Sequence, residues 1–243
     1  YRSAHNNDET RIPQRSPVMF EEFSRRNRAV MAAMSLAATR DWGDLSLADI
    51  AAEANLTIAD LRREFVCKND ILSAFQAEVD AQVLARGKPG GPDDSVRDQV
   101  FEALMTRFEL MAPHKEALKR VSAYLRCRPG EASIFVCSRL VSQYWTLAGA
   151  GAKLDGPTAL VRVAGLSAVY GKAFSVWLED DTVSLDKTMA TLDRGLKNGE
   201  RGMQSLEKAC DTVCGVLRGL KRNFERKGQP DGKPSPEPTP SSV

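Results

Sequence analysis

The stretch from Leu45 to Leu72, LSLADIAAEANLTIADLRREFVCKNDIL, decides how this chain folds. In it, Ser46 and Thr57 are each followed three positions later by an aspartate, which is the spacing of a capping box at the start of a helix. Asn55 lies between the two predicted helices and is one of the few non-glycine residue types that tolerate a left-handed backbone, so it can form a tight turn. The pattern predicts two helices of about nine residues joined by a short turn, the size of a helix-turn-helix unit.

Helical periodicity continues on both sides of this stretch. Apolar residues recur at three- and four-residue steps from Phe20 onward and predict a helix ending near Arg40, and another long helix is predicted from Lys68 to Arg86. A glycine- and proline-rich break follows at 87–92. The helices predicted beyond it span 94–112, 114–126, 131–150, 157–178, 182–198 and 201–227. No alternating strand pattern occurs in the sequence, so we expect an all-α fold.

These patterns divide the chain into a small domain, a larger one and polar ends. The last fourteen residues hold five of the twelve prolines, a composition typical of disorder. The predicted parts are a disordered arm (1–18), a helix-turn-helix domain (19–86), a helical-bundle domain (93–199), an amphipathic basic helix (200–228) and a disordered tail (229–243).

Composition narrows the class of protein. Apolar residues make up 42% of the chain and charged residues 27%, which are ordinary values for a soluble globular protein. No run of eighteen uncharged apolar residues occurs, and the polar start lacks the apolar core of a signal peptide. The five cysteines are scattered without a CxxC pair, and His5 and His114 are the only histidines. We therefore expect a cytoplasmic protein with neither a metal site nor a cofactor.

Motifs of catalysis are missing from the sequence. There is no glycine-rich phosphate loop and no Ser/His/Asp or Cys/His set, and the adjacent carboxylates Asp180 and Asp181 are more simply explained as helix caps. The sequence thus predicts no catalytic residue and a non-enzymatic function.

The stretch quoted above resembles the DNA-reading region of the TetR family of bacterial transcriptional regulators. The resemblance covers roughly residues 22–85 and includes the alanine-rich segment 32–38, Phe65 and the helix start Lys68-x-x-Ile71-Leu72. It implies a dimeric repressor that binds a palindromic operator in double-stranded DNA and responds to a small effector held in an all-helical second domain. The chain departs from the family pattern in having Asn55 where glycine is usual.

The resemblance and the helix-turn-helix geometry together predict the residues that face DNA. With the apolar residues of both helices turned inward, Thr57, Ile58, Ala59, Arg62 and Arg63 remain to face the major groove. Either arginine could contact guanine through two hydrogen bonds, which is worth about 1–3 kcal/mol of discrimination. Ser46 and Lys68 are predicted to hold phosphates.

The acidic balance of the helix-turn-helix region leaves open an alternative in which this region does not bind DNA. Residues 1–86 hold 11 Lys/Arg and 13 Asp/Glu, a balance of −2, and Asp60 and Glu64 add negative charge close to the predicted DNA surface. The helix-turn-helix could therefore be degenerate and serve only as a three-helix packing unit.

The larger domain is expected to bind the effector and to form the dimer. Segments 157–178 and 182–198 are the candidate interface between subunits in a homodimer. The candidate residues lining a pocket for a small apolar effector are the aromatic residues Tyr124, Tyr144, Trp145, Phe174 and Trp177.

A second resemblance supports an alternative function. The run 176–181, with Lys187-Thr188-Met189 and Leu192-Asp193-Arg194, resembles TetR-like proteins related to lipid-binding accessory proteins of ubiquinone biosynthesis. The segment 201–227 has apolar residues at a strict three- and four-residue spacing and 7 Lys/Arg against 3 Asp/Glu. Such a helix suits an anionic membrane surface. The same pattern suits a helix docked on its own domain, which is the commoner outcome, or a two-stranded coil. The alternative is therefore a lipid-binding accessory protein that contacts membranes peripherally through this helix.

Overall fold

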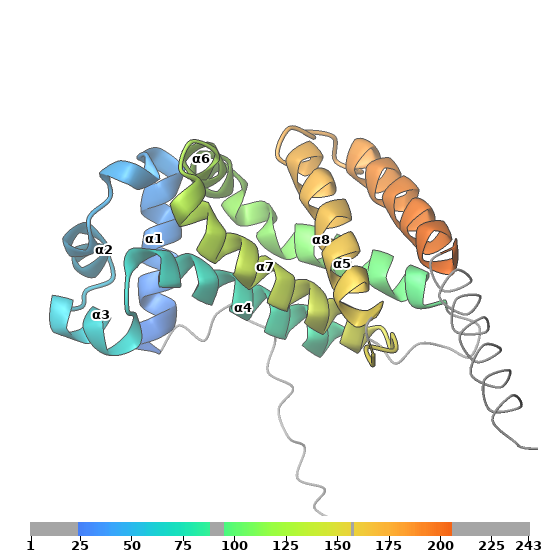
Figure 1. Cartoon of the computed structure of the whole chain (residues 1–243). Coiled ribbons are helices and arrows are strands. Elements are labelled where there is room, and N and C mark those ends of the chain that lie inside the picture. The colour runs from blue at the N-terminus through green and yellow to red at the C-terminus, as the bar shows by residue number, and fades with distance from the viewer. Residues whose placement is uncertain (1–23, 88–94, 157, 206–243) are drawn as a thin grey trace, which may run out of the picture. The chain divides into compact units, whose positions relative to one another are not determined.

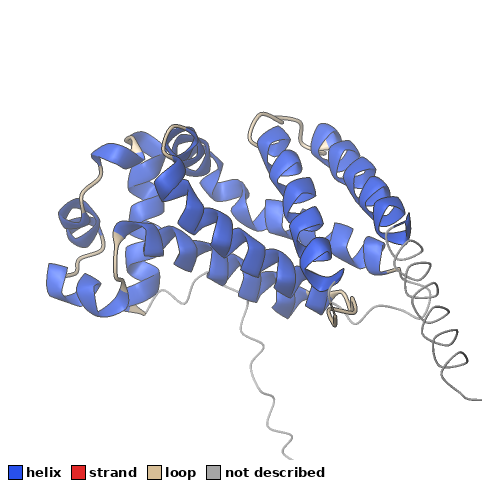
Figure 2. Cartoon of the chain, viewed as in Figure 1, coloured by secondary structure: helices blue, strands red, loops and turns tan. Residues whose placement is uncertain are grey.

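The computed structural model describes residues 24–87, 95–156 and 158–205, and within these ranges the secondary structure is helical without a strand (Figures 1 and 2). The predicted all-α fold is confirmed. The α-helices are α1 (Arg25–Thr39), α2 (Leu47–Glu53), α3 (Ile58–Glu64), α4 (Lys68–Arg86), α5 (Val96–Met111), α6 (Lys115–Arg126), α7 (Pro129–Gly149), α8 (Thr158–Trp177) and a further helix over 186–205. Short 3₁₀ turns occupy Trp42–Asp44 and Ala112–His114.

Both predicted capping boxes form. The Ser46 hydroxyl accepts a hydrogen bond from the Asp49 N–H at 3.1 Å, and the Asp49 carboxylate accepts one from the Ser46 N–H at 2.8 Å. Thr57 and Asp60 make the same reciprocal pair, at 3.1 Å in both directions. Asn55 has a φ of 51°, so the left-handed turn between α2 and α3 is confirmed as well. Each of the two helices has seven residues and is shorter than the nine predicted.

A buried core holds the first four helices together. Ile50 and Leu61 face inward from α2 and α3, with 0% and 2% of their surface exposed. Trp42 is fully buried beside them and belongs to the same apolar cluster as Phe75 of α4. Because α1 contacts α2, α3, α4 and α6, it joins the helix-turn-helix to the remaining helices.

The described chain divides into two compact units near the predicted boundary at 199/200. The chain up to Leu196 forms one compact unit, and the chain from Lys197 forms a second. The predicted break at 87–92 does not divide the first unit, because α4 packs against α5 and α7 as well as against α1. The predicted arm (1–18), the tail (229–243) and most of the basic segment 201–227 lie outside the described residues.

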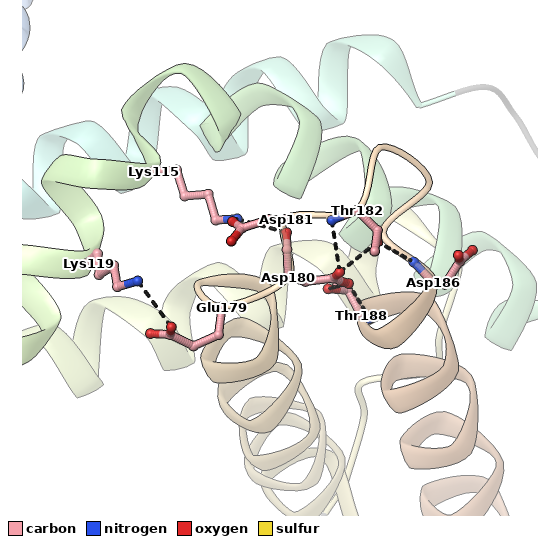
Figure 3. Close-up of polar contacts among 8 residues, drawn as sticks. All are labelled: Lys115, Lys119, Glu179, Asp180, Asp181, Thr182, Asp186 and Thr188. Carbon is pink, nitrogen blue, oxygen red and sulfur yellow. Dashed lines mark hydrogen bonds and ion pairs between the residues drawn. The ribbon is translucent and has the colours of Figure 1, made fainter.

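A buried carboxylate shapes the corner between α8 and the helix that follows it (Figure 3). Asp180 is 1% exposed; one of its oxygens accepts hydrogen bonds from the N–H and hydroxyl of Thr182, and the other accepts the same pair from Thr188. Thr188 lies in the first turn of the last helix, so Asp180 caps that helix, as predicted from the sequence. The helix begins at 186 instead of the predicted 182, because Leu185 takes a left-handed φ of 52°.

The stability of this corner should depend on pH. Burial raises the pKa of Asp180, but the hydrogen bonds from Thr182 and Thr188 outweigh burial and hold the pKa well below its usual value. A lowered pKa in the folded state stabilises the fold above the unfolded pKa, near 3.8, and this contribution is lost as the pH falls below that value. We expect Asp180→Asn to lower the free energy of unfolding more at pH 7 than at pH 3, as measured by urea titration. An equal loss at both values would contradict this prediction.

Candidate nucleic-acid interface

The helix α3 presents its polar side outward and its apolar side to the core. Leu61 and Phe65 are 2% and 5% exposed, whereas Ile58 is 51% exposed and the side chain of Arg63 is 70% exposed. Thr57, Ala59 and Arg62 are exposed too, and both α2 and α3 lie at one end of the first compact unit (Figure 1). All five residues predicted to face a DNA groove are therefore on the solvent side of α3.

The aspartate in α3, Asp60, is largely buried and lies beside two arginines. Its carboxylate lies 3.0 Å from the Arg25 guanidinium and 3.5 Å from that of Arg63, and its side chain is only 18% exposed. Hydrogen bonds from Thr57, aided by Arg25 and Arg63, hold the pKa of Asp60 below its usual value. The negative charge of Asp60 is thus paired with arginines, and its carboxylate serves as a helix cap.

A second arginine of α1 fixes the other end of α3. The Arg26 guanidinium donates a hydrogen bond to the Glu64 backbone carbonyl at 2.9 Å and lies 4.9 Å from the centre of the Phe65 ring. Hydrogen bonds to the last carbonyls of a helix satisfy groups that have no partner within the helix. The roles of Arg25 and Arg26 could not be predicted from the sequence, because only the crossing of α1 and α3 brings them to residues 35 and 38 positions away.

The two cap residues donate their hydrogen bonds within the protein. The hydroxyl of Ser46 donates to Asp49 at 2.6 Å, and that of Thr57 donates to Asp60 at 2.7 Å. The backbone N–H of each residue donates to the same carboxylate as its hydroxyl. Neither residue therefore has a free donor for a phosphate, and both act by fixing where their helices begin.

Lys68, predicted to hold a phosphate, makes hydrogen bonds within the protein. Its ammonium donates hydrogen bonds to the carbonyls of Trp42 at 2.6 Å and Leu45 at 2.9 Å, and it lies 5.0 Å from the centre of the Trp42 ring. Burial lowers the pKa of Lys68. The side chain joins the start of α4 to the loop before α2, so it holds the helix-turn-helix in place and does not reach outward.

Removing this ammonium should cost stability. We expect Lys68→Ala to lower the free energy of unfolding by about 1–3 kcal/mol, because two carbonyls lose their donor and a cation leaves an aromatic face. The measurement is urea denaturation, with Lys153→Ala, an exposed lysine outside the helices, as the matched control. An unchanged stability combined with weaker binding to every DNA sequence would instead support the phosphate role.

A pocket of about 280 Å³ opens among α4, α5, α6, α7 and α8. Phe174 lines it, and Trp177 is buried beside it with the two rings stacked at 5.7 Å. Tyr144 and Trp145 are 44% and 51% exposed on α7 and do not line the pocket.

Tyr124 likewise lies outside that pocket, in a surface groove between α6 and the loop before α2. It packs against the position of Gly43, lies 4.0 Å below the Arg128 guanidinium and donates a hydrogen bond to Glu131. Of the five aromatic residues predicted to line an effector pocket, the structure therefore places only Phe174 on its wall.

Fold and exposed surface together define an all-helical protein with a helix-turn-helix at one end. A crystal structure of the TetR transcriptional regulator from Nitrosomonas europaea ATCC 19718 superposes with a TM-score of 0.59 at 20% sequence identity. The match covers 73% of this chain and 98% of that one. A TetR transcriptional regulator from Rhodococcus sp. RHA1 matches with a TM-score of 0.49 at 19% identity, over 74% and 97% of the two chains. No protein-family model and no curated protein matches the sequence. The chain thus has the fold of a TetR transcriptional regulator.

Proposed function

We propose that this protein is a non-enzymatic, sequence-specific DNA-binding transcriptional regulator that acts as a repressor and uses α3 as its recognition helix. The observation that carries the proposal is the outward face of α3, where Arg62 and Arg63 are exposed while Asp60 is paired with Arg25. A short helix with exposed arginines and small residues at its start can enter a major groove. Arg62 and Arg63 would contact guanine, and Ile58 and Ala59 would contact thymine methyl groups.

Selection from a random pool of DNA duplexes tests this function. The full-length chain should enrich a palindromic sequence, and its affinity for that sequence should fall steeply as salt rises, because bound arginines release counterions from the phosphates. Failure to enrich any sequence would overturn the proposal. If the chain instead floated with anionic liposomes in a manner that required 201–227, lipid handling would be the supported function.

We also propose that the regulator is a homodimer joined through α8 and the helix after it. Leu160 and Val161 on α8 are 79% and 47% exposed. By length and composition alone, α8 is apolar enough to cross a membrane. Only 28% of the eighteen-residue apolar stretch that meets this criterion is buried within the chain. A long apolar helix with so much exposed surface requires a partner, and a second copy of the same helix satisfies this need symmetrically.

A charge placed on this face should separate the subunits. We expect Leu160→Glu to convert the dimer into a monomer at micromolar concentration, because two carboxylates would face each other across an apolar contact. Sedimentation velocity measures the outcome. The matched control is Val183→Glu, since Val183 is fully exposed in the loop before the last helix. An unchanged sedimentation coefficient for Leu160→Glu would place the interface elsewhere.

The pocket among α4 to α8 is the proposed effector site. Its wall includes Phe75 and Gln76 of α4, the helix that begins directly after α3. An effector held there contacts the same helix that anchors the helix-turn-helix through Lys68. This continuity supports a coupling between the pocket and the DNA-binding surface.

A further inference from the structure

The polar groups on the wall of the pocket indicate what chemistry it accepts. Most of the lining is apolar and comes from side chains such as Leu118, Phe135 and Phe174. A pocket of this kind selects its ligand by a few polar groups placed among apolar ones. Three such groups line the pocket, on α4, α7 and α8: Gln76, Arg139 and Tyr170.

The first group is the guanidinium of Arg139. It is half-buried, and its Nε donates a hydrogen bond to the Ser167 hydroxyl at 3.2 Å. A Cβ at Gly171 would lie 3.1 Å from Nη1 of Arg139, so the glycine lets the guanidinium lie against α8. Glu179 is the carboxylate on the same pocket wall, and it pairs with Lys119 at 3.1 Å. Among the described residues, no carboxylate forms an ion pair with Arg139.

The other two groups are deeply buried. Gln76 is 7% exposed, and its Oε1 has no hydrogen-bond partner among the described residues. Tyr170 is 3% exposed; its hydroxyl lies 3.9 Å from the sulfur of Met111, a weak acceptor, and it also interacts with Arg107. Unpaired buried polar groups are costly, so a ligand that pairs with them gains affinity.

We propose that the pocket binds a small amphipathic carboxylate, with its apolar body among the aromatic side chains and its carboxylate on Arg139. A half-buried guanidinium without a counter-ion favours an anion, and its two outer nitrogens match the two oxygens of a carboxylate. The Tyr170 hydroxyl supplies a further hydrogen-bond donor to the polar end. This inference refines the effector role proposed above, since it replaces a purely apolar ligand with an anionic one.

The volume limits the size of the ligand. A water molecule occupies about 30 Å³ in the liquid, so 280 Å³ corresponds to roughly nine waters. Octanoate, which has ten non-hydrogen atoms, is a suitable probe. Octan-1-ol and octylamine also have eight carbons, with a neutral and a cationic end, so the three probes have similar apolar chains and differ at the polar end.

Isothermal titration calorimetry of the full-length protein with the three probes tests the proposal. We expect octanoate to bind at least tenfold more tightly than octan-1-ol, and octylamine to bind more weakly than either. If octan-1-ol binds as tightly as octanoate, or if octanoate does not bind, the proposal is overturned. This comparison requires no variant, so it does not depend on any substituted chain folding.

A variant then assigns the charge to one residue. Arg139→Gln should weaken octanoate at least tenfold and leave octan-1-ol within about twofold, and Arg139→Lys should recover part of the loss because it restores the positive charge. Arg86→Gln removes an exposed arginine at the far end of α4 and should change neither affinity. Unchanged octanoate binding by Arg139→Gln would overturn the assignment.

DNA is absent from these titrations. A failure of octanoate to bind would leave the DNA-binding proposal standing, and a failure to select DNA would leave the carboxylate site standing.

Discussion

The double variant Arg62→Ala/Arg63→Ala is expected to lose its preference for the selected operator over random DNA. Each bidentate contact between arginine and guanine is worth about 1–3 kcal/mol of discrimination, so loss of both lowers the specificity ratio on the order of 100-fold. The fold should survive, because both side chains are exposed and Asp60 keeps Arg25 at 3.0 Å as its partner. Fluorescence anisotropy with the operator and a scrambled duplex at fixed salt measures the ratio.

The matched control for this variant is Arg86→Ala, which removes one exposed arginine at the other end of α4. It should lower neither the specificity ratio nor the thermal stability. A double variant that still preferred its operator would show that α3 does not read sequence. The helix-turn-helix would then serve only as a three-helix packing unit.

The largest effect on stability is expected at an ion pair buried among α4, α5 and α7. Asp80 accepts hydrogen bonds from the Arg107 guanidinium and from the Ser142 hydroxyl, the latter at 2.7 Å. Arg107 is 2% exposed, lies over the Tyr170 ring at 5.6 Å and reaches the Thr146 hydroxyl at 3.4 Å. Among the residues that the structure describes, its Nε has no hydrogen-bond partner, and Asp80 is the carboxylate that pairs with the guanidinium.

Removing one partner should therefore cost far more than removing both. We expect Asp80→Leu to lower the free energy of unfolding by about 3–5 kcal/mol, because an uncompensated charge stays buried. The double variant Asp80→Leu/Arg107→Met should recover most of that loss, since an apolar pair leaves no buried charge. Urea denaturation of both single variants and the double variant completes the thermodynamic cycle. A loss below about 1 kcal/mol for Asp80→Leu would mean that water reaches the arginine.

Local sequence signals were sufficient for the helices and the turn of the DNA-binding unit. The capping boxes at Ser46 and Thr57 join residues three positions apart, and Asn55 takes its left-handed conformation by itself. The chain reads as all-α for the same reason, because hydrophobic periodicity is a property of each segment alone. The exposed positions of α3 follow from it once Leu61 and Phe65 are assigned to the core.

Tertiary structure decided the partners of the charged and aromatic side chains. Lys68 bonds to carbonyls 26 and 23 positions earlier, and Asp60 pairs with an arginine of α1, so neither set of partners could be predicted from sequence spacing. The pocket brings Gln76, Arg139 and Tyr170 together from three helices. Such contacts depend on how helices far apart in the chain cross, and the periodicity of one helix does not specify the face of another against which it packs.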